Sequence, residues 1–308
     1  MEKINREGQF SGELRYDEPM SAHTTFKVGG KADAWVRPEK DIFPAYAAKL
    51  LEAAEEEGVP VFVLGGGANI VVGDGGIRGI VLDTGSWQGM DSPIESEEEA
   101  ISVRLLSGSS VDGIADQLAA GGLSGLEFLA GMPGSVGGAI WMNARCYERS
   151  VSDALIETEI LDEDRRKQAI PFRPEDFSYK KSPFQGRKVI ILSGRFAVRV
   201  REPKEIYDEM AVYRRDRVDK GHYRFPSAGS AFKNNRDFGD PTGRIIDQLG
   251  LRGFSVGGAQ VAPWHGNIII NTGGATATDI KLLAAEVARR VKEERGFELE
   301  SEILYIGE

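Results

Sequence analysis

The pattern of apolar and polar positions predicts a chain of alternating helices and strands. Apolar residues recur at helical spacing in several segments, and a glycine follows closely where each of these patterns stops. Helices are expected over 41–57, over the charged segment 203–219, over 243–249 and 278–295, and between Ser110, which can cap its helix, and Gly121. The helix over 278–295 should bury a stripe formed by Ile280, Leu283, Val287 and Val291. Strands are expected over 61–64, 101–105, 154–161, 188–200 and 297–306. This mixture indicates an α+β chain, while periodicity alone leaves the topology open.

The 38 glycines of the 308-residue chain gather in clusters between these periodic segments. The clusters lie at 65–67, 73–79, 121–138 and 253–274. Glycine lets a backbone approach another group more closely than any residue with a side chain does. The clustering therefore indicates loops whose backbone lies close against something else.

The first cluster directly follows a predicted strand, in the segment VFVLGGGANIVVGDGG at 61–76. Successive glycines allow backbone N–H groups to converge on one anion, such as a diphosphate. A tight turn between two strands explains the same residues equally well. The segment is not the dinucleotide-binding fingerprint, because no G-x-G-x-x-G opens a helix here.

A second segment, GLSGLEFLAGMPGSVGGAIWMNA at 122–144, is apolar and rich in glycine, with Glu127 as its only charge. It is too flexible for a plain helix and too irregular for a plain strand. Such a stretch suits a buried loop that wraps a flat, largely apolar cofactor and offers N–H groups to its phosphates. A purely structural buried loop is the alternative.

Charge and composition narrow the classes of function. The net charge is −10, which disfavours a nucleic-acid-binding protein. Cys146 is the only cysteine and there are three histidines, so neither a disulfide framework nor a metal site is expected. The first ten residues are polar and no apolar stretch approaches membrane-spanning length. We expect a cytoplasmic protein that contacts no membrane.

Several long motifs, in order along nearly the whole chain, resemble the UDP-N-acetylenolpyruvoylglucosamine reductase family. The motifs are HTTFKVGGKAD at 23–33, LGGGANIVVGDGGIRGIVL at 64–82, GLEFLAGMPGSVGGAIWMNA at 125–144, FSYKKSPFQ at 177–185, PSAGSAFKN at 226–234 and IIDQLGLRGFSVGGAQVAPWHGNIIIN at 245–271. The short PSAGSAFKN form is similar to the compact type II subclass. Several long matches in the same order are far more specific than one short motif.

The resemblance implies an FAD-binding cradle of the vanillyl-alcohol-oxidase (PCMH) type in two subdomains, plus a C-terminal α+β substrate-binding domain. The first subdomain would span 1–83 together with 299–308, so that the last strand returns to it. The second would span 84–203, and the boundary region near 83–98 contains most of the acidic segment DSPIESEEE at 91–99, which is typical of an exposed connection. The substrate-binding domain would span 204–298.

The resemblance also implies the reaction. An oxidoreductase acting on a CH–CH group would reduce UDP-N-acetylglucosamine enolpyruvate to UDP-N-acetylmuramate in peptidoglycan precursor synthesis. Non-covalent FAD would be the cofactor and NADPH the co-substrate. Hydride would pass from flavin N5 to C3, and a proton would go to C2. The implied cofactor-binding residues are Gly65, Gly66, Gly67, Ala68, Asn69, Ile70, Gly131, Pro133, Gly134, Ser135, Gly137, Gly138 and Ala139.

Three residues carry the implied catalysis. Ser230 by itself is typical of a turn or cap, and Glu302 of a charge at a strand edge. The resemblance makes Ser230 the proton donor to C2, with Lys233 as a candidate supporting donor, and makes Glu302 a group that polarises the substrate carboxylate. Lys180 stands where the family pattern Tyr-Arg-x-Ser has arginine. Lysine keeps the positive charge and loses the two-pronged fork, so two accounts stay open: Lys180 stabilises the enolate, or a nearby arginine does.

The resemblance points to Tyr179, Lys220, Asn234 and, with less support, Arg214 as substrate contacts. A diphosphate requires local positive charge, although a solvated helix face explains most of the basic stretch at 214–224. We expect a monomer. Two other functions remain: an FAD-linked oxidase with the same cradle, and a flavin- or sugar-nucleotide-binding protein without catalysis.

Overall fold

The computed structural model of the chain describes residues 11–95 and 101–308, and it divides into two compact units. Unit 1 contains the residues up to Arg15 together with 34–66 and 79–215. Unit 2 contains 16–33, 67–78 and 216–308. The polar first ten residues and part of the acidic segment at 91–99 lie outside the described residues. The three-part layout expected from the sequence stays a prediction.

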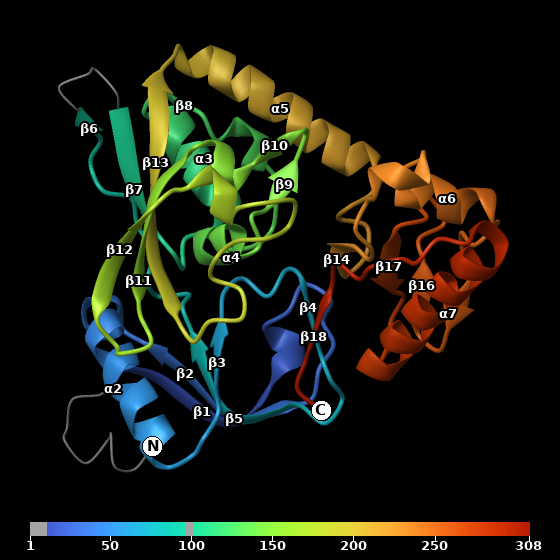
Figure 1. Cartoon of the computed structure of the whole chain (residues 1–308), viewed down its shortest axis with the longest axis horizontal. Helices are drawn as coiled ribbons and strands as arrows, with labels where there is room; N and C mark the ends of the chain where they lie inside the picture. Colours follow the sequence, from blue (N-terminus) through green and yellow to red (C-terminus); the bar gives the residue numbers. More distant parts are fainter. Residues whose placement is uncertain (1–10, 96–100) are drawn as a thin grey trace. The chain divides into compact units, whose positions relative to one another are not determined.

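The larger sheet of unit 1 is antiparallel. Its order is β12 (Lys167–Pro171), β11 (Leu155–Leu161), β13 (Ile190–Val200), β7 (Ile101–Leu106) and β6 (Ile94–Glu95), and β8 (Leu123–Ser124) also pairs with β13. Helices α3 (Val111–Ala120) and α4 (Val136–Trp141) share one apolar core with this sheet (Figure 1). Ser110 caps α3, as predicted, by accepting a hydrogen bond from the Gly113 N–H. This core holds α4, and with it the second glycine-rich segment.

A second sheet has the order β1 (Gly12–Pro19), β2 (Lys31–Pro38), β5 (Ile77–Asp83) and β3 (Val61–Leu64). Strands β1, β2 and β5 each divide between the two units. Helix α2 (Phe43–Glu56) packs within unit 1 through Phe43, Ala47 and Leu50 against apolar residues of these strands. The first glycine cluster begins directly after β3.

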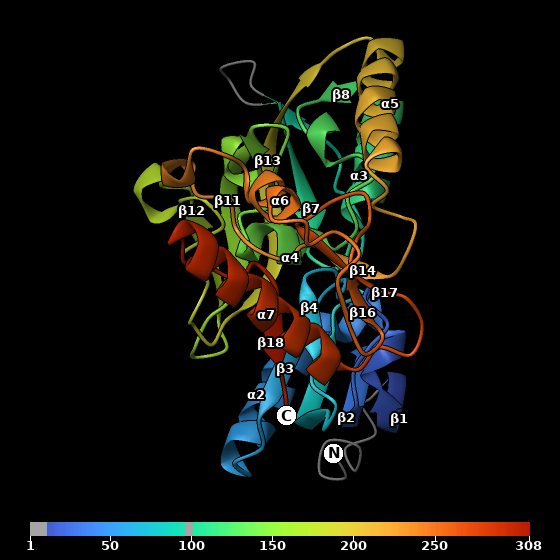
Figure 2. The same cartoon turned by 90° about the vertical axis from the view of Figure 1, so that its right-hand side faces the viewer.

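Unit 2 is built on the sheet β14 (Ser227–Ser230), β17 (Ile268–Asn271), β16 (Ala259–Val261) and β15 (Ser255–Val256). Helix α7 (Ala277–Arg295) packs against this sheet with α6 (Thr242–Gln248) beside it (Figure 2). The predicted stripe of α7 is confirmed: Ile280, Leu283, Val287 and Val291 are all buried. Strand β4 (Ile70–Val72) pairs in parallel with β18 (Leu304–Ile306), so the end of the chain returns to the segment after the first glycine cluster.

The remaining elements are short, apart from α5 (Pro203–Asp219), which confirms the charged helix expected there. Besides the pair of β4 and β18, a second two-stranded sheet is formed by β9 (Arg145–Cys146) and β10 (Arg149–Ser150). The described 3-10 helices are Met20–Ala22, Lys40–Ile42, Glu127–Leu129, Val151–Asp153, Pro174–Asp176 and Arg236–Phe238. Within 11–95 and 101–308, the structure contains no helix long and apolar enough to cross a membrane.

Two predictions of local structure were wrong. The strand expected over 297–306 is regular only at β18, because the residues before it pair with the segment after β14. The glycine-rich segment at 122–144 is no continuous loop, since it contains a 3-10 turn and α4. Capping by Ser135 and burial of Val136 and Ile140 stabilise this short helix despite its two glycines.

Candidate active site

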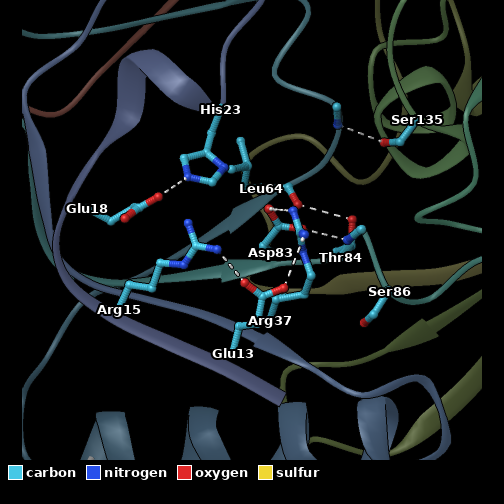
Figure 3. Close-up of polar contacts among 12 residues, drawn as sticks. Glu13, Arg15, Glu18, His23, Arg37, Leu64, Asp83, Thr84, Ser86 and Ser135 are labelled. Carbon is cyan, nitrogen blue, oxygen red and sulfur yellow. Dashed lines mark hydrogen bonds and ion pairs between the residues drawn. The ribbon is translucent and has the colours of Figure 1, made fainter.

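The first two glycines after β3, Gly65 and Gly66, belong to unit 1, and hydrogen bonds at Leu64 and Gly66 fix the backbone there. The Leu64 carbonyl accepts hydrogen bonds from the Thr84 N–H at 2.9 Å and from the Thr84 hydroxyl at 3.1 Å (Figure 3). Gly66 donates its N–H to Ser135 Oγ at 3.3 Å. A Cβ on Gly66 would lie 2.6 Å from the Cα of Gly134. The two glycine-rich segments therefore meet backbone to backbone, which only glycine allows.

An ion pair between β2 and the last residue of β5 supports the same region. Arg37 forms a two-pronged ion pair with Asp83, at 3.2 Å and 3.1 Å, and Gly85 donates its N–H to the same carboxylate at 2.6 Å (Figure 3). Asp83 is buried. A buried carboxylate with three charge-assisted or backbone donors is a rigid anchor, so the ends of β3 and β5 have one defined geometry.

Ser135 is the central residue of the second segment. It caps α4, and its Oγ accepts the N–H of Gly138 at 3.3 Å as well as that of Gly66. Gly137 donates to the Ser107 carbonyl at 2.8 Å, and a Cβ there would lie 2.8 Å from the Ser107 Cβ. Ser135 and Ala139 are buried, while Gly66, Pro133 and Gly138 are exposed. The exposed residues Gly66, Pro133 and Gly138 therefore surround the buried side chain of Ser135. This arrangement suits a cofactor that binds against the main chain.

Gly131 explains where the Arg214 side chain lies. Gly131 has a φ of 73° and donates its N–H to Asp112 Oδ1 at 2.6 Å. The same oxygen accepts a hydrogen bond from Arg214 at 2.6 Å, and Arg214 also donates to Asp116 at 2.8 Å. The guanidinium thus ties α5 to α3 and supports the turn at Gly131. A contact between Arg214 and substrate stays a prediction, and the structure gives this side chain other partners.

The remainder of the first run, Gly67 to Ile70, belongs to unit 2. Gly67 is buried with a φ of 60°, and a Cβ there would meet the His23 carbonyl. The side-chain amide of Asn69 donates to the backbone carbonyl of Glu302 at 2.9 Å. The backbone carbonyl of Asn69 accepts the Leu304 N–H at 3.1 Å. A predicted cofactor-binding residue therefore fixes the peptide of a predicted catalytic residue.

Ser230 lies at the end of β14 after a β-bulge. Ser227 pairs with Ile270 and Ser230 with Ile268, so β14 advances by one residue more than β17. Gly229, with a φ of 75°, takes the left-handed conformation that such a bulge requires. A bulge re-aims the side chain that follows it, which makes the direction of Ser230 a built feature of the strand.

Glu302 lies on the segment that pairs with the chain directly after Ser230. The Glu302 N–H donates to the Ala231 carbonyl at 2.9 Å, and Phe232 forms an antiparallel bridge with Ser301. Glu302 is buried, at 9% exposure. Two predicted catalytic residues that are distant in sequence are thereby brought onto neighbouring backbone segments. Lys233, the candidate donor in support of Ser230, forms an ion pair with Glu300 at 2.5 Å, and its role beside Ser230 stays a prediction.

Lys180 lies in a tight turn of unit 1, next to Tyr179. Ser178 and Lys181 exchange backbone hydrogen bonds across the turn, and Lys180 has a φ of 60°, which is uncommon for a residue with a side chain. Asn143 donates to the Ser178 carbonyl at 2.9 Å. Gln185 donates to the Lys180 carbonyl at 3.1 Å and also contacts the end of α4. The turn is therefore fastened to the helix that Ser135 caps.

The predicted substrate contacts of unit 2 are polar and exposed. Lys220 pairs with Asp216 at 2.8 Å, and the side chain of Asn234 accepts the Thr242 N–H at the start of α6. Burial lowers the pKa of the nearby His222 to about 4, and the positive charge of Arg217 adds to this effect. His222 is consequently neutral near pH 7, and the positive charge expected to meet a diphosphate comes from lysine and arginine.

Two buried asparagines, Asn143 and Asn267, were not singled out by the sequence analysis. Asn143 donates to the Ser178 carbonyl in the turn of Lys180 and accepts the Ser152 N–H, and Asn267 makes two side-chain hydrogen bonds to Phe232, two residues after Ser230. Their only signal in the sequence is a polar amide within an apolar stretch. In the described parts of the chain, no group of three His, Cys, Asp or Glu side chains could hold a metal ion.

Two family models match the chain. The FAD binding domain model matches residues 43–165, and the model of the UDP-N-acetylenolpyruvoylglucosamine reductase C-terminal domain matches 221–306. The first match covers β3, the exposed glycines and α4, and the second covers Ser230 and Glu302. The predicted fold class, an FAD-binding α+β part followed by a C-terminal α+β part, is confirmed by these matches.

Whole-chain relatives extend the likeness. The chain is 39% identical to UDP-N-acetylenolpyruvoylglucosamine reductase of Treponema denticola, over 96% of this chain and 94% of that protein. It is 38% identical to the protein of the same name in Borrelia garinii subsp. bavariensis, over 99% and 95% of the two chains. The crystal structure of UDP-N-acetylenolpyruvylglucosamine reductase from Thermus caldophilus matches with a TM-score of 0.77 and 33% identity, over 96% and 99% of the two chains. This chain therefore belongs to the UDP-N-acetylenolpyruvoylglucosamine reductase family.

Proposed function

We propose that this chain is an FAD-dependent oxidoreductase that uses NADPH to reduce UDP-N-acetylglucosamine enolpyruvate to UDP-N-acetylmuramate in peptidoglycan precursor synthesis. Family membership over nearly the whole chain supports the substrate and the cofactor. One observation of the structure carries the proposal: backbone pairing between Ala231 and Glu302 holds a hydroxyl and a carboxyl on adjacent segments. Reduction of an enol ether needs both an acid and a group that stabilises the enolate.

FAD, when bound, supplies a carrier that takes hydride from NADPH and passes it to the substrate. Its contacts are proposed to come from the residues predicted above within 65–70 and 131–139. Gly66, Gly134 and Gly138 would let it lie against the main chain, and Ser135 would hold the backbone of Gly66 and Gly138 in place by accepting their N–H groups. Neither range contains His or Cys, so the cofactor is proposed to bind without a covalent link.

The proposed roles of the catalytic residues follow the charge that develops. Hydride adds to C3 of the enolpyruvyl group, and the electron pair of the double bond moves toward C2 and the carboxylate. Glu302 and Lys180 are proposed to stabilise this charge, Glu302 by a hydrogen bond to the carboxylate and Lys180 by its positive charge. Ser230 is proposed to donate its hydroxyl proton to C2, which completes the reduction.

The proposed substrate contacts are Tyr179, Lys220 and Asn234, with Arg214 as the least supported of the four. Tyr179 is exposed and adjoins Lys180 in the same turn. Lys220 is exposed beside Asp216 and can turn toward a diphosphate. We propose further that the protein works as a monomer in the cytoplasm.

The test is an assay of the purified chain. The expected results are a yellow flavin spectrum and NADPH oxidation that depends on the enolpyruvyl nucleotide sugar. NADPH oxidation that proceeds with oxygen and ignores the sugar nucleotide would instead indicate an oxidase. A colourless protein that does not take up FAD would contradict both enzymatic functions.

A further inference from the structure

The side chain of Asn267 in unit 2 pairs with both backbone polar groups of one residue, Phe232. Its Oδ1 accepts the Phe232 N–H at 2.9 Å, and its Nδ2 donates to the Phe232 carbonyl at 2.8 Å. Asn267 is 2% exposed, so these bonds form without competition from water. A side-chain amide that pairs with both polar groups of one residue replaces the partner strand at that point.

The geometry of the pairing explains why a side chain is needed there. The bridge between Phe232 and Ser301 uses the Ala231 carbonyl and the Lys233 N–H on one side of the segment. The N–H and carbonyl of Phe232 itself face the opposite side. The bulge at Gly229 has shifted the register with β17 just before this point, and Asn267 supplies the missing donor and acceptor.

The main chain of Asn267 adds a further fixed point. Its carbonyl accepts the Ala231 N–H at 2.8 Å, and its N–H donates to His265 Nδ1 at 3.1 Å. Ala231 is therefore bound to Asn267 through its N–H and to Glu302 through its carbonyl. Ser230 lies between this doubly held residue and the bulge glycine, with little freedom left in its backbone.

We propose that Asn267 is the positioning residue for Ser230, setting the direction from which the hydroxyl proton reaches C2. The inference rests on the proposed function, because it assumes that Ser230 is the proton donor. Proton transfer depends steeply on the placement of donor and acceptor, and a displacement of about 1 Å can lower a rate by about 100-fold. Loss of the clamp should therefore slow protonation of C2 without affecting steps that do not use Ser230.

The experiment separates the two half-reactions of the FAD-loaded enzyme by stopped-flow absorbance. Asn267→Ala removes both side-chain bonds to Phe232. We expect flavin reduction by NADPH to stay within about two-fold of the unmodified rate, while flavin reoxidation by the enolpyruvyl sugar slows by about 10- to 100-fold. The KM for that sugar should change little, and the solvent deuterium isotope effect on reoxidation should rise as proton transfer becomes limiting.

Asn271→Ala is the matched control. Asn271 is the last residue of β17, the strand that begins directly after Asn267; it is also buried, and it binds Phe26, Gly273 and Ala275 through its side chain. These three partners are neither sequence neighbours of Ser230 nor hydrogen-bonded to Ala231. A comparable loss of thermal stability is expected in both variants, while the slow reoxidation and the raised isotope effect should be confined to Asn267→Ala.

A second pair of variants guards against misfolding of Asn267→Ala. Gly229→Ala and Gly253→Ala place a side chain at φ values of 75° and 76°, and in both cases the added Cβ meets nothing within 4 Å. Both variants carry the same backbone strain, and only Gly229 adjoins Ser230. Gly229→Ala should therefore slow reoxidation, and Gly253→Ala should not.

Three outcomes are decisive. Slow reoxidation confined to Asn267→Ala and Gly229→Ala supports the proposal. Reoxidation and isotope effects equal to those of the controls overturn it, because Asn267 would then be merely structural. If the unmodified enzyme accepts electrons from NADPH but is not reoxidised by the enolpyruvyl sugar, the proposed function fails first, and this result is distinct from a failure of the positioning role.

Discussion

The turn that contains Lys180 and the strand end that contains Ser230 each include one residue in the left-handed conformation, but the residue differs between the two regions. Before Ser230 the left-handed residue is Gly229, so the conformation carries little strain, and backbone pairing fixes the segment on both sides. In the turn at 178–181 the lysine itself is left-handed, at a conformational cost of about 1–2 kcal/mol. The serine is thus placed by the sheet, and the lysine by the hydrogen bonds of Asn143 and Gln185.

This contrast has a practical consequence. A substitution of the Ser230 side chain should change chemistry and leave the backbone in place, because none of the hydrogen bonds that hold the neighbouring segment uses its hydroxyl. A substitution of Lys180 changes charge and backbone conformation together. Experiments on the two regions therefore need different controls.

The largest expected effect is that of Ser230→Ala. Loss of a general acid typically lowers a rate by about 10²- to 10⁴-fold, and we expect that loss in flavin reoxidation by the enolpyruvyl sugar. Flavin reduction by NADPH and the thermal midpoint should match the unmodified protein. Stopped-flow absorbance and differential scanning fluorimetry measure the three quantities, and rapid reoxidation of the variant would remove Ser230 from the mechanism.

Glu302→Gln should have the next largest effect. The variant keeps the backbone bond to Ala231 and changes only the buried carboxyl group, so turnover should fall by about 10²- to 10³-fold with the fold intact. Glu300→Gln is the control, since Glu300 lies two residues earlier, is exposed, and pairs with Lys233. Equal steady-state rates for the two variants would argue against a role for Glu302.

Substitutions of Lys180 should separate charge from conformation. Lys180→Ala and Lys180→Gly both remove the charge and should both lower turnover by about 10- to 100-fold. The glycine variant should be more stable than the alanine variant by about 1 kcal/mol, because only glycine adopts the turn without strain. Urea unfolding and steady-state kinetics measure the two effects.

Two further lysine variants complete that test. Lys181→Ala changes the exposed neighbouring lysine and should leave turnover near that of the unmodified protein. Lys180→Arg asks whether the site is tuned to lysine, in which case turnover falls severely. Full turnover in Lys180→Ala would instead return the role to a nearby arginine, the alternative that the sequence left open.

The longer helices could be predicted from the sequence, because their apolar patterns and caps are local, whereas the short glycine-containing helix α4 could not. The candidate catalytic roles came from the resemblance of several motifs along the chain and stay predictions. The stripe of α7 and the Ser110 cap of α3 are read within a few residues of the chain. The pairing of Glu302 with Ala231 could not be predicted, because it joins segments that are distant in sequence. For the same reason the sequence could not show that Asp112 binds Arg214, or that Asn267 holds Phe232.

The smallest expected effect concerns the cofactor region. Ser135→Ala removes the acceptor for the Gly66 and Gly138 N–H groups and the cap of α4, which should cost about 1 kcal/mol of stability and weaken FAD binding about 5-fold. Ser110→Ala removes the matching cap of α3 and should lower stability without a comparable change in FAD affinity. Fluorescence titration of the apoprotein with FAD distinguishes them, and equal affinities would contradict the role of Ser135.

The most direct test of the proposed reaction is the fate of hydrogen when the unmodified enzyme turns over in D₂O with unlabelled NADPH. Proton donation by Ser230, whose hydroxyl exchanges with solvent, predicts deuterium at C2 of the new lactyl group. The hydrogen that goes to C3 comes from the reduced flavin. Deuterium at C3 is therefore expected only in the fraction of molecules whose flavin N5 hydrogen exchanges with D₂O before the transfer. NMR of the product reads both positions. Deuterium at C2 in every product molecule is the predicted result, and a product with protium at C2, or no reduced product, would contradict the account.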